Sequence, residues 1–169
     1  MKNIIFIGMP ASGKSTVGVV VAKRLGYEFI DTDLLIQKQE KRLLKEIIAD
    51  VGNEGFLEIE NQVNRDLQAQ QAVISPGGSV VYCQEAMEHF KKIGTVVYLK
   101  VSFETIKRRL RNAQRRGVVL KEGQTLKELY EERIRLFEKY ADYTILEEEQ
   151  GFEKTIDKVL AIFEEQNKE

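Results

Sequence analysis

The chain has few of the residues that build covalent or metal-bound frameworks. It contains one cysteine, one histidine, two prolines and no tryptophan among 169 residues. The lone Cys83 excludes an internal disulfide, which suits a reducing compartment, and we expect it to be a small buried side chain. His89 lies in a surface-helix pattern without a partner at metal-ligand spacing. The composition therefore excludes a disulfide scaffold and gives no sign of a histidine- or cysteine-based metal site.

The sequence also lacks a long hydrophobic run and an excess of either charge. No stretch is long enough to span a bilayer, and the N-terminal residues read as a core strand rather than a signal peptide. The 26 basic and 27 acidic residues give a net charge of −1, so there is no global attraction to nucleic acid or to a membrane surface. We expect a cytoplasmic protein that folds as a single domain over residues 1–169.

Strand and helix signals alternate along the whole chain. Apolar, β-rich runs occur at 3–8, 27–30, 72–75, 95–101 and 143–146, and helical patterns at 15–25, 56–70, 85–92, 103–114, 125–140 and 152–165. Such alternation predicts an α/β fold of three layers, with a parallel five-stranded sheet covered by helices on both faces. Ligands of these folds bind at the carboxyl ends of the strands.

A complete phosphate-binding loop occupies residues 8–16, directly after the first apolar run. Its sequence is Gly-Met-Pro-Ala-Ser-Gly-Lys-Ser-Thr. A strand that ends in this loop, with a helix starting at Ser15, aims backbone N–H groups and a helix N-terminus at one point. We expect ATP to be held by Gly8, Ala11, Ser12, Gly13, Lys14, Ser15 and Thr16. Lys14 would reach the outer phosphates, and the Ser15 hydroxyl would ligate Mg²⁺.

Two carboxylates, Asp31 and Asp33, close the second strand. Close to the metal of a phosphate-binding loop, they would hold a water of the Mg²⁺ shell and orient or deprotonate a substrate hydroxyl. The alternative is that Asp31 or Thr32 caps the following helix, and one residue can cap while the other works. After the third strand, Gly77 and Gly78 would let backbone N–H groups approach a ligand, although a plain turn explains them equally well.

Six basic residues lie between Lys107 and Arg116, and the run leads into a loop bounded by Gly117 and Gly123. A solvated helix face or a local RNA patch would explain the charges. We favour a mobile lid over residues 110–124, because phosphoryl transfer needs a cover that excludes water and brings an arginine to the transferred group. Arg116 fits that role, and Arg109 would stack on the adenine.

Taken together, these motifs resemble the shikimate kinase family, within the P-loop kinases of the nucleoside-monophosphate-kinase type. The resemblance covers essentially the whole chain, from the phosphate-binding loop through Phe-Ile-Asp-Thr-Asp, the glycine pair and the basic lid to Leu-Tyr-Glu-Glu-Arg. It implies transfer of the γ-phosphoryl group of ATP to the 3-hydroxyl of shikimate. The implied roles are Lys14, Asp33 and Arg116 in catalysis, Ser15 and Asp31 at the metal, and Asp33, Gly77, Gly78 and Arg133 at the substrate, Arg133 pairing with its carboxylate.

One departure from the family falls in the acceptor-binding region, residues 33–64. The family pattern Gly-Glu-x-x-Phe-Arg-x-x-Glu corresponds to residues 52–60, where Phe56 and Glu60 keep the register but Leu57 stands in place of the arginine. Loss of a charge-assisted hydrogen bond would weaken carboxylate binding roughly ten- to a hundredfold. Arg65 and Arg135 are not obvious replacements. Asn61 and Asn64 follow Leu57 on the same helical face, which would suit hydroxyls or amides.

These observations predict an ATP- and Mg²⁺-dependent kinase of a small hydroxylated metabolite, foremost shikimate. A kinase of another polyol or of a sugar acid such as gluconate is the alternative within the same class. A nucleotide-dependent regulator is less favoured, because the guanine-recognition motifs of such switches are missing. We expect a monomer that binds neither nucleic acid nor membrane.

Overall fold

The computed structural model describes residues 2–111, 122–147, 151–166 and 168. Its five strands are β1 (Asn3–Ile7), β2 (Glu28–Asp31), β3 (Ala72–Ser75), β4 (Gly94–Lys100) and β5 (Tyr143–Leu146). The α-helices are α1 (Lys14–Leu25), α2 (Thr32–Glu40), α3 (Leu44–Arg65), α4 (Gln84–Ile93), α5 (Phe103–Arg111), α6 (Leu126–Tyr140) and α7 (Phe152–Gln166), and a short 3₁₀ helix, η1, covers Val80–Tyr82.

The strands form one sheet in the order β2-β3-β1-β4-β5, and every pairing is parallel. In the centre of the sheet, Ile5 of β1 is in register with Ile74 of β3 and with Val96 of β4. Because the strands run the same way, the loops that follow β1, β2 and β3 meet at one edge of the sheet. The predicted five-stranded parallel architecture is confirmed.

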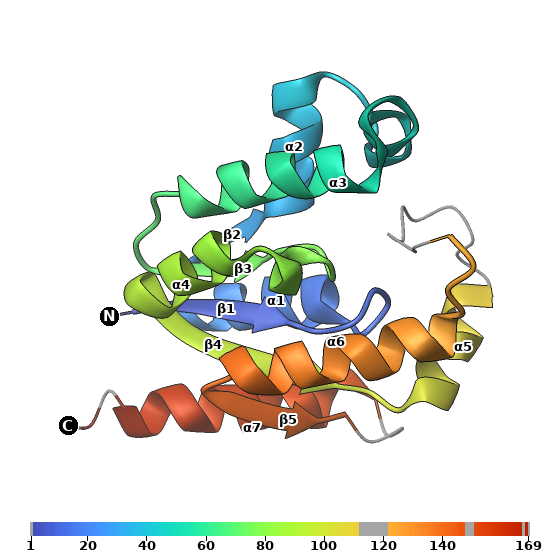
Figure 1. The fold of residues 1–169 in the computed structure, drawn as a ribbon. Coiled ribbons are helices and arrows are strands. Elements are labelled where there is room, and N and C mark those ends of the chain that lie inside the picture. The colour runs from blue at the N-terminus through green and yellow to red at the C-terminus, as the bar shows by residue number, and fades with distance from the viewer. Residues whose placement is uncertain (1, 112–121, 148–150, 167, 169) are drawn as a thin grey trace.

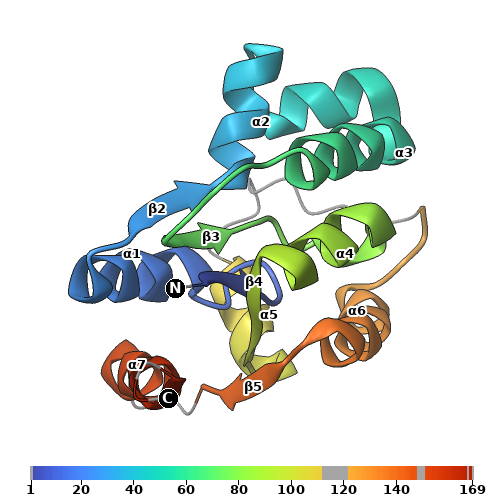
Figure 2. The same ribbon diagram turned by 90° about the vertical axis from the view of Figure 1, so that its left-hand side faces the viewer.

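Helices cover both faces of the sheet, so the fold has three layers (Figure 2). Successive residues of a strand point to opposite faces, and β1 shows this directly. Ile5 and Ile7 belong to the core under α4 and α6, whereas Ile4 and Phe6 belong to the core under α1 and α7. All four side chains are almost fully buried, which explains why the strand reads as an unbroken apolar run.

Helices α2 and α3 lie beyond the β2 edge of the sheet (Figure 1), and α3 also packs against α4. They pack on each other through a small core of their own that includes Ile36, Ile47 and Phe56. Sequence periodicity placed one helix at 56–70 here, and this prediction was wrong at both ends. Gly52 has φ 74° and ψ 178°, which interrupts α3 in its middle and obscures the pattern of its first half. The helix then ends at Arg65.

No helix within the described part of the chain is both long enough and apolar enough to cross a membrane. The predicted lid, residues 110–124, falls mainly on residues 112–121, which lie outside the described residues, as does Arg116.

Candidate active site

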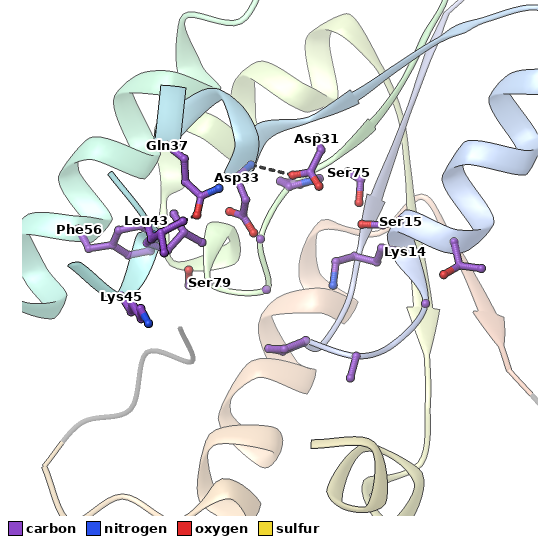
Figure 3. A pocket seen from close by; sticks show the side chains of 18 of the residues that line it. Lys14, Ser15, Asp31, Asp33, Gln37, Leu43, Lys45, Phe56, Ser75 and Ser79 are labelled. Carbon is purple, nitrogen blue, oxygen red and sulfur yellow. Dashed lines mark hydrogen bonds between the residues drawn. The ribbon is translucent and has the colours of Figure 1, made fainter. Parts of the chain in front are cut away.

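A cavity of about 540 Å³ opens where the loops after β1, β2 and β3 meet (Figure 3). Its walls come from four places. The phosphate-binding loop and α1 provide one side, the β2–α2 junction and the loop after β3 provide the middle, and the start of α3 with Phe56 provides the far side. The lining residues are Pro10, Ala11, Gly13, Lys14, Ser15, Thr16, Asp31, Asp33, Gln37, Leu43, Leu44, Lys45, Phe56, Ser75, Pro76, Gly77, Gly78, Ser79 and Arg133.

The phosphate-binding loop is held in shape by the lysine that it is predicted to present to a nucleotide. Lys14 Nζ donates hydrogen bonds to the carbonyl oxygens of Gly8 (3.0 Å) and Met9 (2.8 Å), and lies 3.4 Å from Ser12 Oγ. The ammonium group thus links the first two residues of the loop with Ser12. The N-terminus of α1 directs backbone N–H groups toward this place, which suits an anion.

Two residues outside the loop, Phe152 and Arg109, contact its backbone and support its conformation. A side chain at Gly13, where φ is 95°, would overlap the ring of Phe152, so α7 packs directly against the loop. Arg109 Nη1 donates a 3.0 Å hydrogen bond to the carbonyl of Ala11, a non-glycine residue with φ 64°. These contacts stabilise a conformation that the loop alone would adopt poorly.

Arg109 is itself anchored by Glu147. The guanidinium forms a two-pronged ion pair with both carboxylate oxygens of Glu147, at 2.6 and 3.1 Å, and lies over the Phe152 ring at 5.5 Å. Glu147 is 4% exposed, although its sequence context of three glutamates reads as a solvated turn. Arg109 therefore contacts the phosphate-binding loop directly, and its predicted stacking on adenine stays a prediction.

Asp31 is a helix cap. Its Oδ1 accepts hydrogen bonds from the backbone N–H groups of Asp33 (2.9 Å) and Leu34 (3.3 Å), which orders the first turn of α2. Its carboxylate lies beside Ser75 and near Ser15 on one wall of the cavity (Figure 3). Hydroxyl and carboxylate oxygens of this kind suit Mg²⁺, which takes only one or two protein ligands beside phosphate oxygens and water. The described residues contain no cluster of three acidic, histidine or cysteine ligands.

Two carboxyl groups, the half-buried Asp33 and the fully buried Glu60, lie close together in the middle of the cavity region and differ in protonation. Burial, together with the neighbouring Asp31 carboxylate, raises the pKa of Asp33 to about 6, although Lys14 opposes the shift. Burial raises the pKa of Glu60 to about 8, against the opposing hydrogen bond from Ser79. At pH 7 Asp33 is thus ionised and Glu60 is protonated, so only Asp33 is in the state that accepts a proton.

The glycine pair after β3 allows three elements to meet. A Cβ on Gly77 would lie 2.8 Å from Asp33 Oδ1 and 3.0 Å from Glu60 Oε2. A Cβ on Gly78 would lie 2.7 Å from Pro10 Cδ and 3.1 Å from Arg133 Nη1. Glycine is therefore required at 78, where the ring and backbone of Pro10 leave no room, whereas at 77 a side chain would displace the two carboxyl groups.

The next residue, Ser79, is buried beside this glycine pair. It donates a 2.6 Å hydrogen bond to Glu60 Oε1 and so ties this loop to α3.

Arg133 is the largest fully buried side chain of the described residues, with 1% exposure. It projects from α6 into the cavity lining, and its guanidinium lies 5.4 Å from the centre of the Tyr82 ring. Burial lowers its pKa, while Tyr82 and Glu60 oppose the shift. A buried cation of this kind suits an anionic group of a ligand.

Leu57 lies outside the cavity and cannot take over the role of an arginine there. It is half-buried against the core under α4 and α6, is not among the lining residues, and its carbonyl accepts a 3.5 Å contact from Cys83 Sγ. The predicted roles of Asn61 and Asn64 toward hydroxyls or amides of a ligand find no support. Asn61 Oδ1 accepts from Ala86 N, and Asn64 Nδ2 donates to the carbonyl of Glu60.

The structure also adds cavity residues that the sequence reasoning missed. Gln37 and Lys45 lie in α2 and in the first turn of α3, which the periodicity did not reveal. Phe56 and Glu60 could have been predicted as residues near the site, because both match the family pattern on either side of Leu57. Of the predicted residues, the cavity brings together Lys14, Ser15, Asp31, Asp33, Gly77, Gly78 and Arg133.

Comparison with known proteins places this site in a family. The family model for shikimate kinase matches residues 10–164. A shikimate kinase of Clostridium botulinum (strain 657 / Type Ba4) is 42% identical over 143 residues, which cover 82% of this chain and 84% of the relative. The shikimate kinase of Thermodesulfovibrio yellowstonii is 35% identical over 167 residues, covering 97% and 96% of the two chains.

Solved structures agree in fold. The shikimate kinase of Acinetobacter baumannii in complex with shikimate superposes with a TM-score of 0.89 at 30% identity, over 98% of this chain and 94% of the other. The Aquifex aeolicus enzyme gives a TM-score of 0.80 at 31% identity over 98% of each chain. The family match, the identity to its members and the P-loop kinase fold lead to one conclusion: this chain belongs to the shikimate kinase family, whose members are ATP-dependent phosphotransferases with an alcohol acceptor.

Proposed function

We propose that this protein transfers the γ-phosphoryl group of ATP to the 3-hydroxyl of shikimate in the cytoplasm, acting as a monomer. One observation carries the proposal within the family. A single cavity is lined by the phosphate-binding residues Lys14 and Ser15 and also by Asp33 and Arg133. A phosphate donor and an acidic, hydroxylated acceptor would therefore meet in one space, as direct transfer requires.

The donor side uses the phosphate-binding loop. Backbone N–H groups of Gly8, Ala11, Ser12, Gly13 and Thr16 would surround the phosphates, and Lys14 would exchange its bonds to the Gly8 and Met9 carbonyls for phosphate oxygens. Ser15 Oγ and Asp31, the latter through water, would hold Mg²⁺, which supplies neutralisation of phosphate charge. Arg109 would contact the adenine, and Arg116 would clamp the transferred group from the lid.

The acceptor side uses Asp33, the glycine pair and Arg133. Asp33 is ionised at neutral pH and would accept a hydrogen bond from the reacting hydroxyl, orienting it and taking its proton as the bond to phosphorus forms. Gly77 and Gly78 would bring backbone close to the acceptor ring, and Arg133 would pair with the acceptor carboxylate. Leu57 favours one rival, a kinase of an uncharged polyol, because such an acceptor has no carboxylate for an arginine to bind.

An acceptor screen tests the proposal. ADP release is measured with ATP, Mg²⁺ and millimolar shikimate, gluconate or uncharged polyols, with Lys14→Ala as the inactive control. Turnover of shikimate well above the other acceptors, and lost in Lys14→Ala, is expected. If another polyol is phosphorylated while turnover of shikimate is undetectable, the protein is a kinase but shikimate is not its acceptor.

A further inference from the structure

We propose that Lys45 binds the carboxylate of the acceptor and thereby supplies the positive charge that Leu57 does not. This inference rests on the proposed function, because it needs an acceptor that carries a carboxylate.

The position of Lys45 is the first part of the argument. It lies in the first turn of α3, and the cavity lining includes it together with its neighbours Leu43 and Leu44. Figure 3 shows it beside Leu43 and Phe56, on the side of the cavity away from Lys14 and Ser15. Lys45 thus belongs to the acceptor end of the cavity and not to the phosphate end.

The other basic residues near the acceptor end are engaged in ion pairs or do not line the cavity. Arg42 pairs with Asp50 at 2.9 Å. Arg65 pairs with Asp66 and Glu85 at the surface, and Arg135 is exposed and does not line the cavity. Within the described part of the chain, the cationic side chains in the cavity lining are those of Lys14, Lys45 and Arg133.

Lys45 is available to a ligand. It is exposed, and its ammonium makes no hydrogen bond or ion pair with the described residues. The long, flexible lysine stem lets the charge follow an anion within the cavity. Arg133 approaches from α6 and Lys45 from α3, so a carboxylate would be held from two elements.

Helix stability does not explain a lysine at this place. The N-terminal end of a helix carries positive partial charge, so a cation in the first turn is unfavourable by about 0.3–1 kcal/mol. Two amides at this helix start are satisfied by other side chains, since Leu43 N donates to Glu46 Oε2 at 3.0 Å and Leu44 N donates to Gln37 Oε1 at 3.1 Å. A residue that weakens its own helix and faces the substrate cavity is expected at a functional position.

Kinetics with a charged and a neutral acceptor test the proposal. The variants are Lys45→Met, Lys45→Arg and the control Lys38→Met, which removes an exposed lysine of α2 outside the cavity lining. The acceptors are shikimate and its methyl ester, in which the carboxylate is neutral. Thermal unfolding of each variant reports folding, and Lys45→Met is expected to unfold no lower than the parent.

For shikimate, Lys45→Met should raise KM about three- to fivefold, with kcat and the KM for ATP unchanged. Its KM for the ester should match that of the parent, and Lys45→Arg should keep most of the affinity. The proposal is overturned if Lys45→Met behaves like Lys38→Met, or if it raises KM for the ester equally. Failure of the proposed function looks different, because the parent itself would then turn over neither acceptor.

Discussion

Replacing Glu60 by glutamine should remove most of the pH dependence of stability between pH 5 and 7. Glu60 is completely buried, and Ser79 Oγ donates to its Oε1 at 2.6 Å. Its pKa is about 8 in the native protein, against an ordinary value of 4.5 that applies to the unfolded chain. A neutral glutamine keeps the acceptor for Ser79 and has no proton to lose.

The sign of the effect follows from these two pKa values. Below pH 4.5 the carboxyl is protonated in both states, and the native state keeps its full advantage. As the pH rises from 4.5 toward 8, the unfolded chain releases the proton while the native protein retains it, so the free energy of unfolding falls by about 1.4 kcal/mol per pH unit. Between pH 5 and 7 the loss amounts to about 3 kcal/mol.

Urea unfolding at pH 5, 6 and 7 measures this loss. The parent should lose about 3 kcal/mol more than Glu60→Gln over the interval, and Glu58→Gln, an exposed change on the same helix, should follow the parent. Groups common to parent and variant, such as Asp33, cancel in the comparison. Parallel curves for the parent and Glu60→Gln would refute the protonated, buried state of Glu60.

Three further changes test the cavity. Asp33→Asn should lower kcat about a hundredfold or more. In a pH series of steady-state rates, the parent's kcat/KM should rise with pH around pH 6, and the variant should lack this rise. A rise that persists in the variant would assign that titration to another group. Gly78→Ala places a Cβ 2.7 Å from Pro10 Cδ and should cost about 1–3 kcal/mol in urea unfolding and weaken acceptor binding; unchanged stability and KM would show that the loop yields freely. Leu57→Arg should lower the Kd for shikimate by up to about tenfold in calorimetric titration, because arginine is long enough to extend beyond the packed position of Leu57; no gain would show that a side chain at 57 does not reach the acceptor.

The phosphate-binding loop and the sheet could be predicted because their signals are local. Residues 8–16 form one contiguous motif, and β1 reads as an apolar run because its two faces lie under two cores. The carboxylates after β2 and the glycines after β3 could be joined to this loop because parallel strands end at the same edge. Asp31 shows the limit of such reasoning, since the structure assigns its Oδ1 to the helix cap.

The far side of the cavity could not be predicted, because it depends on contacts between distant elements. The non-helical Gly52 interrupts the helical pattern, so the first half of α3 was not recognised in the sequence and Lys45 could not be placed at the cavity. A run of three glutamates is typical of a solvated turn, and the ion pair between Glu147 and Arg109 forms only in the folded chain. The burial of Glu60 and its proton likewise depend on Ser79 and Asp33, which approach from other loops.

The position of the phosphate on the product tests the central claim most directly. Parent enzyme, ATP, Mg²⁺ and shikimate are incubated to completion, and phosphorus and proton NMR locate the ester on the acceptor ring. We predict a single product phosphorylated at the 3-hydroxyl, absent with Lys14→Ala and reduced with Asp33→Asn. Phosphate on another hydroxyl, or ATP hydrolysis without a shikimate ester, would contradict the assignment of Asp33 and Arg133 as the groups that orient the acceptor.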